Sequence, residues 1–240
     1  MQEDRAGFGR GTVDSQYFSH VRSEIAPLIH LTPSRVLEIG CGTGATLGWL
    51  RSRFPGAHLT GVEGAEENRD ALARVADDAV IADLDQGLPV EGRFDLILAL
   101  DVLEHLKDPE AMMKAAAARL TPNGEMIISL PNIAHFSVLG PLLFKRRFDY
   151  AAAGIMDRTH LRMFTESSAL RLANDADLTV TEGIVNGPDN PRARLLDKAS
   201  LGIIRHWLTR QYVFRAVHGS IQSPVNWRPS GLTQQANAQR

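Results

Sequence analysis

Residues 38–44 read Glu38-Ile39-Gly40-Cys41-Gly42-Thr43-Gly44, and this stretch decides the fold. It ends the short apolar run 35–39, which is typical of a buried strand, and it precedes helix-forming residues from about Ala45 to Phe54. Glycines at a strand-to-helix turn let the backbone bend sharply and approach a ligand, because a Cβ would fill the space that the ligand needs. The stretch therefore predicts the ligand-binding turn of an α/β domain.

Strand-like apolar runs alternate with helix-like segments along most of the chain, as expected of βαβ units around a parallel sheet. One helix has a clear start, because Asp108 can cap the first free N–H groups and Pro109 suits the first helical position. The expected strands cover residues 35–39, 59–62, 79–82, 94–100, 125–130, 178–185 and 211–217. The expected helices cover 45–54, 65–75, 109 to the turn at 121–124, a stretch capped by Thr165 that runs to about 176, and 193–209.

The composition is that of one soluble domain that buries a core without disulfides: 240 residues, 44% hydrophobic and 22% charged. The 26 basic and 28 acidic residues give a net charge of −2, so nucleic acid is not an expected partner. Cys41 is the single cysteine, which excludes an internal disulfide and a Cys-x-x-Cys metal site. We therefore expect no bound metal.

The sequence predicts a cytoplasmic location. Its first five residues are polar and carry no apolar signal segment. No run reaches the roughly 18 apolar residues that a membrane-spanning helix needs, so we expect no integral membrane association. The lone cysteine agrees with a reducing compartment.

Two stretches depart from the alternation. Residues 132–164 form a long connection with aromatic and basic residues, and long ordered insertions in compact α/β domains are disproportionately functional. Residues 219–240 are rich in Gln, Asn, Ser and Pro, which predicts a flexible tail. We expect a single domain over residues 1–218, with 132–164 as a lid over the ligand site.

The glycine stretch also satisfies a second pattern. Gly40-x-Gly42-x-x-Ala45 fits the dinucleotide-binding fingerprint, and Glu63 lies at a suitable distance to hold a ribose diol. An NAD-dependent dehydrogenase is therefore an alternative. Against it stand the acid Glu38 two residues before the first glycine, the additional Gly44, and about 34 residues before the first strand.

The glycine stretch is the first of an ordered set of motifs. After Val36 to Gly44 come Gly61-Val62-Glu63-Gly64, Ala82-Asp83-Leu84-Asp85, the segment Phe94 to Leu106, and Pro122-Asn123-Gly124-Glu125. In order and spacing, across roughly residues 17–217, the set resembles the class I S-adenosylmethionine-dependent methyltransferases. The resemblance implies a Rossmann-like, doubly wound α/β fold. Its mostly parallel sheet would have seven strands, the last antiparallel, with an insertion after the fifth strand.

Carried over to the matching positions, the resemblance implies a site for S-adenosylmethionine at the carboxyl edge of the sheet. Glu63 would accept hydrogen bonds from both ribose hydroxyls, because a carboxylate offers two acceptor oxygens. Asp83 and the Leu84 backbone would read the adenine, and Phe18 would close over the cofactor from the N-terminal segment. The implied cofactor-binding residues are Tyr17, Glu38, Gly40, Cys41, Gly42, Gly44, Glu63, Gly64, Asp83, Leu84, Asp101, Val102 and His105.

Methyl transfer from a sulfonium needs alignment and exclusion of water more than covalent help, although an O–H acceptor can also need a base. Imidazole titrates near neutral pH, so three histidines are candidates. His105 matches a position that lines the cofactor pocket. His135 directly follows the fifth strand, and His160 lies in the insertion just before a helix. We predict His160 and His135 as the catalytic residues.

The block from Ile128 to Thr165 resembles a bacterial subgroup that includes MetW-like proteins and methyltransferases of glycan and natural-product pathways. The basic run Lys145-Arg146-Arg147 has two interpretations: it is a solvated turn, or it attracts an anionic acceptor. The apolar face of the helix at 193–209 is expected to pack on the sheet, with a membrane surface as the alternative.

Together these features predict methyl transfer from S-adenosylmethionine to a small-molecule or glycan acceptor, first of all at oxygen. Two alternatives stay open: an NAD-dependent dehydrogenase, and a non-catalytic MetW-like partner protein that retains the cofactor fold. The sequence leaves the oligomeric state unknown.

Overall fold

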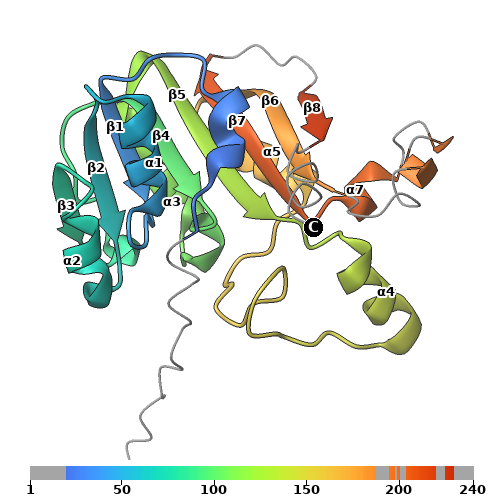
Figure 1. Cartoon of the computed structure of the whole chain (residues 1–240). Helices are drawn as coiled ribbons and strands as arrows, with labels where there is room; N and C mark the ends of the chain where they lie inside the picture. Colours follow the sequence, from blue (N-terminus) through green and yellow to red (C-terminus); the bar gives the residue numbers. More distant parts are fainter. Residues whose placement is uncertain (1–19, 188–194, 198, 201–203, 220–224, 230–240) are drawn as a thin grey trace, which may run out of the picture.

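The computed structural model describes residues 20–187, 195–197, 199–200, 204–219 and 225–229. These residues form an eight-stranded sheet of order β3-β2-β1-β4-β5-β7-β6-β8 (Figure 1). Strand β7 runs antiparallel to both of its neighbours, and the other pairs are parallel. The strands are β1 (Arg35–Ile39), β2 (His58–Glu63), β3 (Asp78–Ile81), β4 (Phe94–Leu100), β5 (Leu120–Pro131), β6 (Leu178–Asn186), β7 (Gln211–His218) and β8 (Asn226–Pro229).

Helices cover both faces of this sheet. The helices are α1 (Ala45–Arg53), α2 (Arg69–Leu72), α3 (Pro109–Arg119), α4 (Phe136–Lys145), α5 (Glu166–Asn174) and α7 (Arg205–Leu208), with 3-10 turns at Ser23–Leu28, Glu66–Asn68, Leu84–Gln86 and Leu103–His105. Neighbouring strand residues point to opposite faces, so β1 contributes Val36 to one core and Leu37 to the other. The first core includes α1 and the turn at Ser23–Leu28, and the second includes α3 and α5.

The predicted fold class is confirmed, and most predicted elements lie within a few residues of the observed ones. Asp108 caps α3 by accepting a hydrogen bond from the Ala111 amide at 2.8 Å, as expected. The predicted helix at 65–75 is wrong in its extent. The chain there forms one 3-10 turn and the four-residue α2.

The sheet has eight strands where seven were expected, because β8 forms within the segment predicted to be a flexible tail. The tail prediction is therefore wrong for Asn226–Pro229, which pairs with β6. Trp227 explains this pairing. Its ring lies over Gly183, where a Cβ would come within 2.2 Å of the indole, and its Nε1 donates to Glu166 Oε1 at 2.9 Å. Residues 220–224 and 230–240 lie outside the described residues.

The predicted helix at 193–209 falls partly outside the described residues, which here include α7. Leu196 and Trp207 belong to the apolar face of that helix and are exposed, so the expected packing against the sheet is wrong for these two side chains. Within the described ranges, no helix is long and apolar enough to cross a membrane.

Candidate functional site

The glycine loop connects β1 to α1 at the carboxyl edge of the sheet. The amides of Gly40 and Cys41 both donate to the Val62 carbonyl, at 2.8 and 3.2 Å, and this holds the loop against β2. Gly40 has φ +70°, and a Cβ there would come within 2.5 Å of the Val102 side chain. Glycine is therefore required at residue 40 by both conformation and packing.

Glu63 ends β2 and is buried directly beside this loop. Its Oε2 accepts from the Gly42 amide at 2.8 Å, and its Oε1 accepts from the Ala65 amide at 2.9 Å. Each carboxylate oxygen has more than one acceptor direction, so both can still accept from a ligand hydroxyl. The carboxylate is thereby fixed in orientation at the sheet edge.

The next acid along the edge is Asp83, which follows β3. It is exposed and accepts from the Asp85 amide at 3.0 Å, which caps the 3-10 turn at Leu84–Gln86. The side chain of Leu84 is buried in the core, so this residue offers the site its backbone. Gly64 is exposed beyond the end of β2.

Asp101, which follows β4, is held in a strained backbone conformation. Its φ is +54°, which is unusual for a residue other than glycine. The carboxylate accepts from Ser129 Oγ at 2.7 Å, Gln211 Nε2 at 2.6 Å and Arg22 Nη1. These three donors come from β5, β7 and the segment before β1, so they fix the aspartate against its strain.

A basic residue, Arg22, and an acidic residue, Glu38, lie behind the glycine loop. The Arg22 guanidinium bonds to Glu24 and Asp101 and retains a buried Nη2 that has no partner among the described residues. Glu38 Oε2 is likewise buried without a partner there. Burial raises the pKa of Glu38 to about 8, although Arg22 and Thr46 act in the opposite direction. The two orphaned atoms suit a ligand that carries both a carboxylate and an ammonium group.

Arg22 was not among the residues predicted for this site. No motif surrounds it, and only its contact with Asp101, 79 residues away, reveals its place in the site. Tyr17 and Phe18, which were expected from the same segment, lie outside the described residues.

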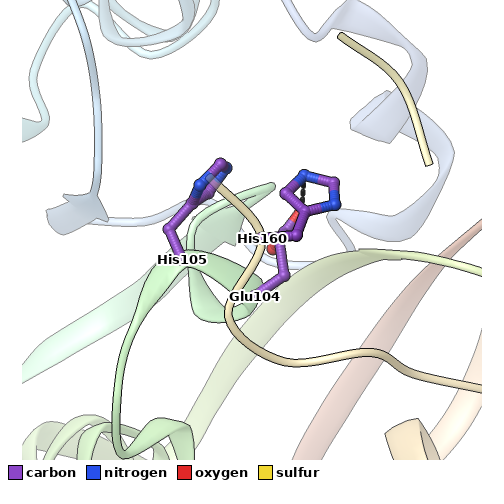
Figure 2. A group of neighbouring side chains, drawn as sticks. All are labelled: Glu104, His105 and His160. Carbon is purple, nitrogen blue, oxygen red and sulfur yellow. Dashed lines mark ion pairs between the residues drawn. The ribbon is translucent and has the colours of Figure 1, made fainter. Parts of the chain in front are cut away.

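Figure 2 shows a second cluster, in which Glu104 and His105 follow β4 and His160 comes from the 132–164 insertion. His160 Nε2 lies 3.9 Å from Glu104 Oε1, and the two imidazole rings meet edge to face with centroids 4.8 Å apart. The amides of Leu161 and Arg162 both donate to the Glu104 carbonyl, which anchors this part of the insertion. The insertion thus places His160 beside the residues that follow β4.

Burial disfavours the charged forms of two members of this cluster, Glu104 and His105. Burial raises the pKa of Glu104 well above its usual value and, together with His160, lowers the pKa of His105. The His105 Nδ1 lies 3.2 Å from the Thr159 carbonyl, and the His160 Nδ1 lies 3.1 Å from the Ile155 carbonyl. Each Nδ1 therefore carries the proton, and each Nε2 is left as an acceptor. Such nitrogens can take a proton or bind a metal ion, and the three ligand atoms lie within 4.8 Å of one another.

His135, the other predicted catalytic residue, is buried at the start of α4. It caps this helix, because its Nδ1 accepts from the Ser137 amide at 3.2 Å. The structure thus gives this imidazole a structural task.

Two predicted cofactor residues have side chains that face the protein interior. The Cys41 thiol lies in the core beneath the loop, where burial raises its pKa. Val102 packs on Gly40. Each offers the site its backbone, while Glu38, Glu63 and Asp101 gather around the loop.

A family model described as a methyltransferase domain matches residues 13–182. The ubiquinone biosynthesis O-methyltransferase of Azorhizobium caulinodans is 37% identical over 134 residues, covering 53% of this chain and 51% of that protein. The protein of the same name from Alkalilimnicola ehrlichii is 28% identical over 193 residues, covering 72% of each chain. This chain thus spans about half the length of some of the curated relatives that it matches.

Among solved structures, an S-adenosylmethionine-dependent methyltransferase from Clostridium acetobutylicum matches with a TM-score of 0.57. The match covers 87% of this chain and 94% of that one, at 14% sequence identity. At this identity the likeness bears on the fold.

Proposed function

The chain belongs to the class I S-adenosylmethionine-dependent methyltransferases, and from this premise we propose that it transfers a methyl group from S-adenosylmethionine to a hydroxyl oxygen of a small organic acceptor. One observation carries the proposal. The glycine loop, the fixed Glu63 carboxylate and the two orphaned atoms of Arg22 and Glu38 meet at one edge of the sheet.

The chemistry of these groups fits S-adenosylmethionine part by part. Arg22 Nη2 would pair with the α-carboxylate of the methionine portion, and Glu38 with its ammonium group. Glu63 would accept from the two ribose hydroxyls, and the exposed Asp83 from the adenine amine. A Cβ at residue 40 would close the space that the loop leaves for the ligand.

The bound cofactor supplies a methyl group already activated by the sulfonium charge. The protein then has to orient the acceptor oxygen in line with the methyl carbon and sulfur, and to exclude water. In our proposal His160 Nε2 takes the proton of the acceptor hydroxyl, and the Ile155 carbonyl, 3.1 Å from Nδ1, holds that imidazole in place. His105 lines the cofactor side of the same cluster.

The oxygen acceptor is favoured by the curated relatives, which are named O-methyltransferases. A sugar hydroxyl offers the same reacting atom, so a glycan acceptor is compatible with this chemistry. The insertion at 132–164 would form the acceptor lid, since it supplies His160.

The direct test measures S-adenosylhomocysteine released in the presence of small phenols, aliphatic alcohols and sugars. We expect turnover with at least one hydroxyl compound and about a 10²-fold or greater loss of kcat in His160→Ala, the scale for removing a general base. His135→Ala should retain kcat and lower stability by about 1 kcal/mol, because it removes a helix cap. Turnover that survives chelation supports a base, whereas loss restored by a divalent ion would assign the cluster to a metal.

A further inference from the structure

The middle of the 132–164 insertion projects from the rest of the protein (Figure 1). We call residues 136–150, which comprise α4 and the five residues after it, the apolar tip. All residues from 142 to 154 are exposed. Large apolar side chains in the tip have high exposed fractions: Phe136 57%, Leu142 41%, Leu143 70%, Phe144 86%, Phe148 44% and Tyr150 51%. Contiguous exposure of this kind marks an interaction surface.

The ends of the insertion are fixed, so the tip is held in this outward position. Near one end, the Ile133 amide donates to the Phe164 carbonyl at 2.8 Å. Near the other, Leu161 and Arg162 are bonded to Glu104. Within the tip, the Arg147 amide donates to the Pro141 carbonyl at 3.2 Å. The apolar side chains therefore face outward on an anchored segment.

The exposed residues of α4 form a stripe. Leu143 and Phe144 follow Phe136 by seven and eight residues, so the three share one side of the helix. Val138 is the buried residue of α4 and faces the protein. The helix thus uses one side for anchoring and leaves an exposed apolar side, on which Phe136 contacts the His135 ring and Leu143 and Phe144 face outward.

Basic residues lie directly beside this stripe. Lys145, Arg146 and Arg147 end α4 and follow it, and Asp149 pairs with Arg147. The tip has three basic residues and one acidic residue, which gives +2, whereas the whole chain is at −2. In a symmetric pair of copies joined through this surface, these like charges would face each other. An apolar stripe with a basic border is instead complementary to a surface of anionic lipid.

We propose that the apolar tip docks this protein on membrane surfaces that contain anionic phospholipid. Leu143 and Phe144 enter the headgroup region, and the basic residues bind lipid phosphates. Docking would turn the acceptor side of the protein, which includes His160, toward the membrane. The proposal concerns binding alone and does not depend on the methyl-transfer reaction.

The experiment is co-sedimentation of the full chain with phosphatidylcholine vesicles, with and without phosphatidylglycerol. We expect binding to the mixed vesicles and little to phosphatidylcholine alone. Leu143→Ser/Phe144→Ser should lower the partition coefficient at least tenfold, because these side chains supply the apolar contact. Lys145→Gln/Arg146→Gln should lower it by about tenfold or more. The control Arg74→Gln/Lys114→Gln removes the same charge from two exposed residues on other elements and should bind as the wild type does.

Three outcomes would overturn the proposal. The first is no binding of the wild type to anionic vesicles. The second is an equal loss of vesicle binding in the control variant, which would show that binding depends on the overall charge of the protein and not on the tip. The third is unchanged binding in Leu143→Ser/Phe144→Ser, above all if these substitutions instead dissociate a dimer in sedimentation analysis. Circular dichroism of each variant confirms that the fold is retained.

Discussion

Glu38 and Glu63 end up beside the same glycine loop, yet their surroundings prepare them for different tasks. Glu63 has both oxygens fixed by backbone amides of residues 42 and 65. These donors fix the orientation of the Glu63 carboxylate, whose oxygens can still accept from ligand hydroxyls. Glu38 retains a buried oxygen that has no partner in the described part of the chain, and its pKa is raised to about 8. A nearby ligand cation would lower the pKa of Glu38 and favour its ionised form. The state of Glu38 therefore depends on the ligand, whereas the orientation of Glu63 is already fixed without it.

The first prediction concerns Glu63. Glu63→Ala should weaken binding of S-adenosylhomocysteine by roughly 1–3 kcal/mol, the scale for losing hydrogen bonds to a charged group. Isothermal titration calorimetry measures this change. Glu67→Ala, which alters an exposed glutamate in the next turn, serves as the matched control. Equal affinity of the two variants would refute the ribose assignment.

The second prediction concerns the protonation of Glu38. Its pKa is raised from an ordinary 4.5 to about 8 in the fold, so folding favours the protonated form. This contribution to stability is complete below pH 4.5 and is lost as pH rises toward 8. Between pH 6 and 8.5 the free energy of unfolding should fall by up to about 2 kcal/mol more in the wild type than in Glu38→Gln.

Urea unfolding of the ligand-free protein at several pH values checks this difference. Glu104 also has a raised pKa and contributes to the slope in both proteins, so only the difference between them reports on Glu38. Parallel curves would show that Glu38 is already ionised in the fold.

The sequence predicts the positions of the site acids better than the roles of Arg22 and His135. The acids at strand ends were predictable, because strand position fixes their place at the sheet edge. Arg22 enters the site through its contact with Asp101, a residue far from it in the sequence. A single arginine has no local sequence pattern that would predict this contact. His135 was placed correctly after a strand, but its role as a helix cap depends on where α4 begins.

At the scale of elements, strand β8 shows how one side chain can order a segment whose composition resembles a tail. Trp227 packs on Tyr212 and Phe214, with ring centroids 5.1 and 6.5 Å apart, and hydrogen-bonds to Glu166. A low count of apolar residues therefore did not prevent strand formation, because the sheet already offered a gap at Gly183. Composition gives the average apolar content of a segment, whereas the pairing of β8 depends on the packing of one residue, Trp227.

The third prediction follows from this packing. Trp227→Ala should lower stability by about 2 kcal/mol, below the cost of a fully buried tryptophan because this one is half-buried. For a chain of this size the loss corresponds to roughly 4–8 °C in Tm. Trp207→Ala makes the same change at an exposed site and should shift Tm little. Similar shifts in both variants would mean that β8 adds nothing to the fold.

The helix predicted at 65–75 shows the opposite case. Its Ala, Glu and Arg residues favour helix locally, yet α2 has four residues. Chain from this region packs under the glycine loop, where Val75 lies within 2.5 Å of a Cβ built at Gly44. Tertiary contacts here override propensity, which is a weak constraint over so short a stretch.

At the scale of the whole molecule, the near-neutral charge hides an uneven distribution. The chain has a net charge of −2, while the apolar tip carries +2 and the cofactor edge gathers Glu38, Glu63, Asp83 and Asp101. The tip and the edge meet through the insertion, which runs from β5 past α4 and back to Glu104. The same insertion thus joins the proposed base to the proposed membrane contact, so docking and acceptor binding would occur on one side of the protein.

The last prediction distinguishes the two cofactor alternatives in the intact protein. A ligand that binds only the folded state stabilises it by about 2.7 kcal/mol at 100 times its Kd, which for this size raises Tm by roughly 5–10 °C. S-adenosylhomocysteine should produce such a shift, and NAD should not. The Arg22 and Glu38 atoms that lack a partner among the described residues match an amino acid and have no counterpart in a dinucleotide. A shift with NAD alone would assign the loop to a dehydrogenase. Stabilisation by S-adenosylhomocysteine without turnover on any hydroxyl compound would instead favour a binding protein that keeps the cofactor fold.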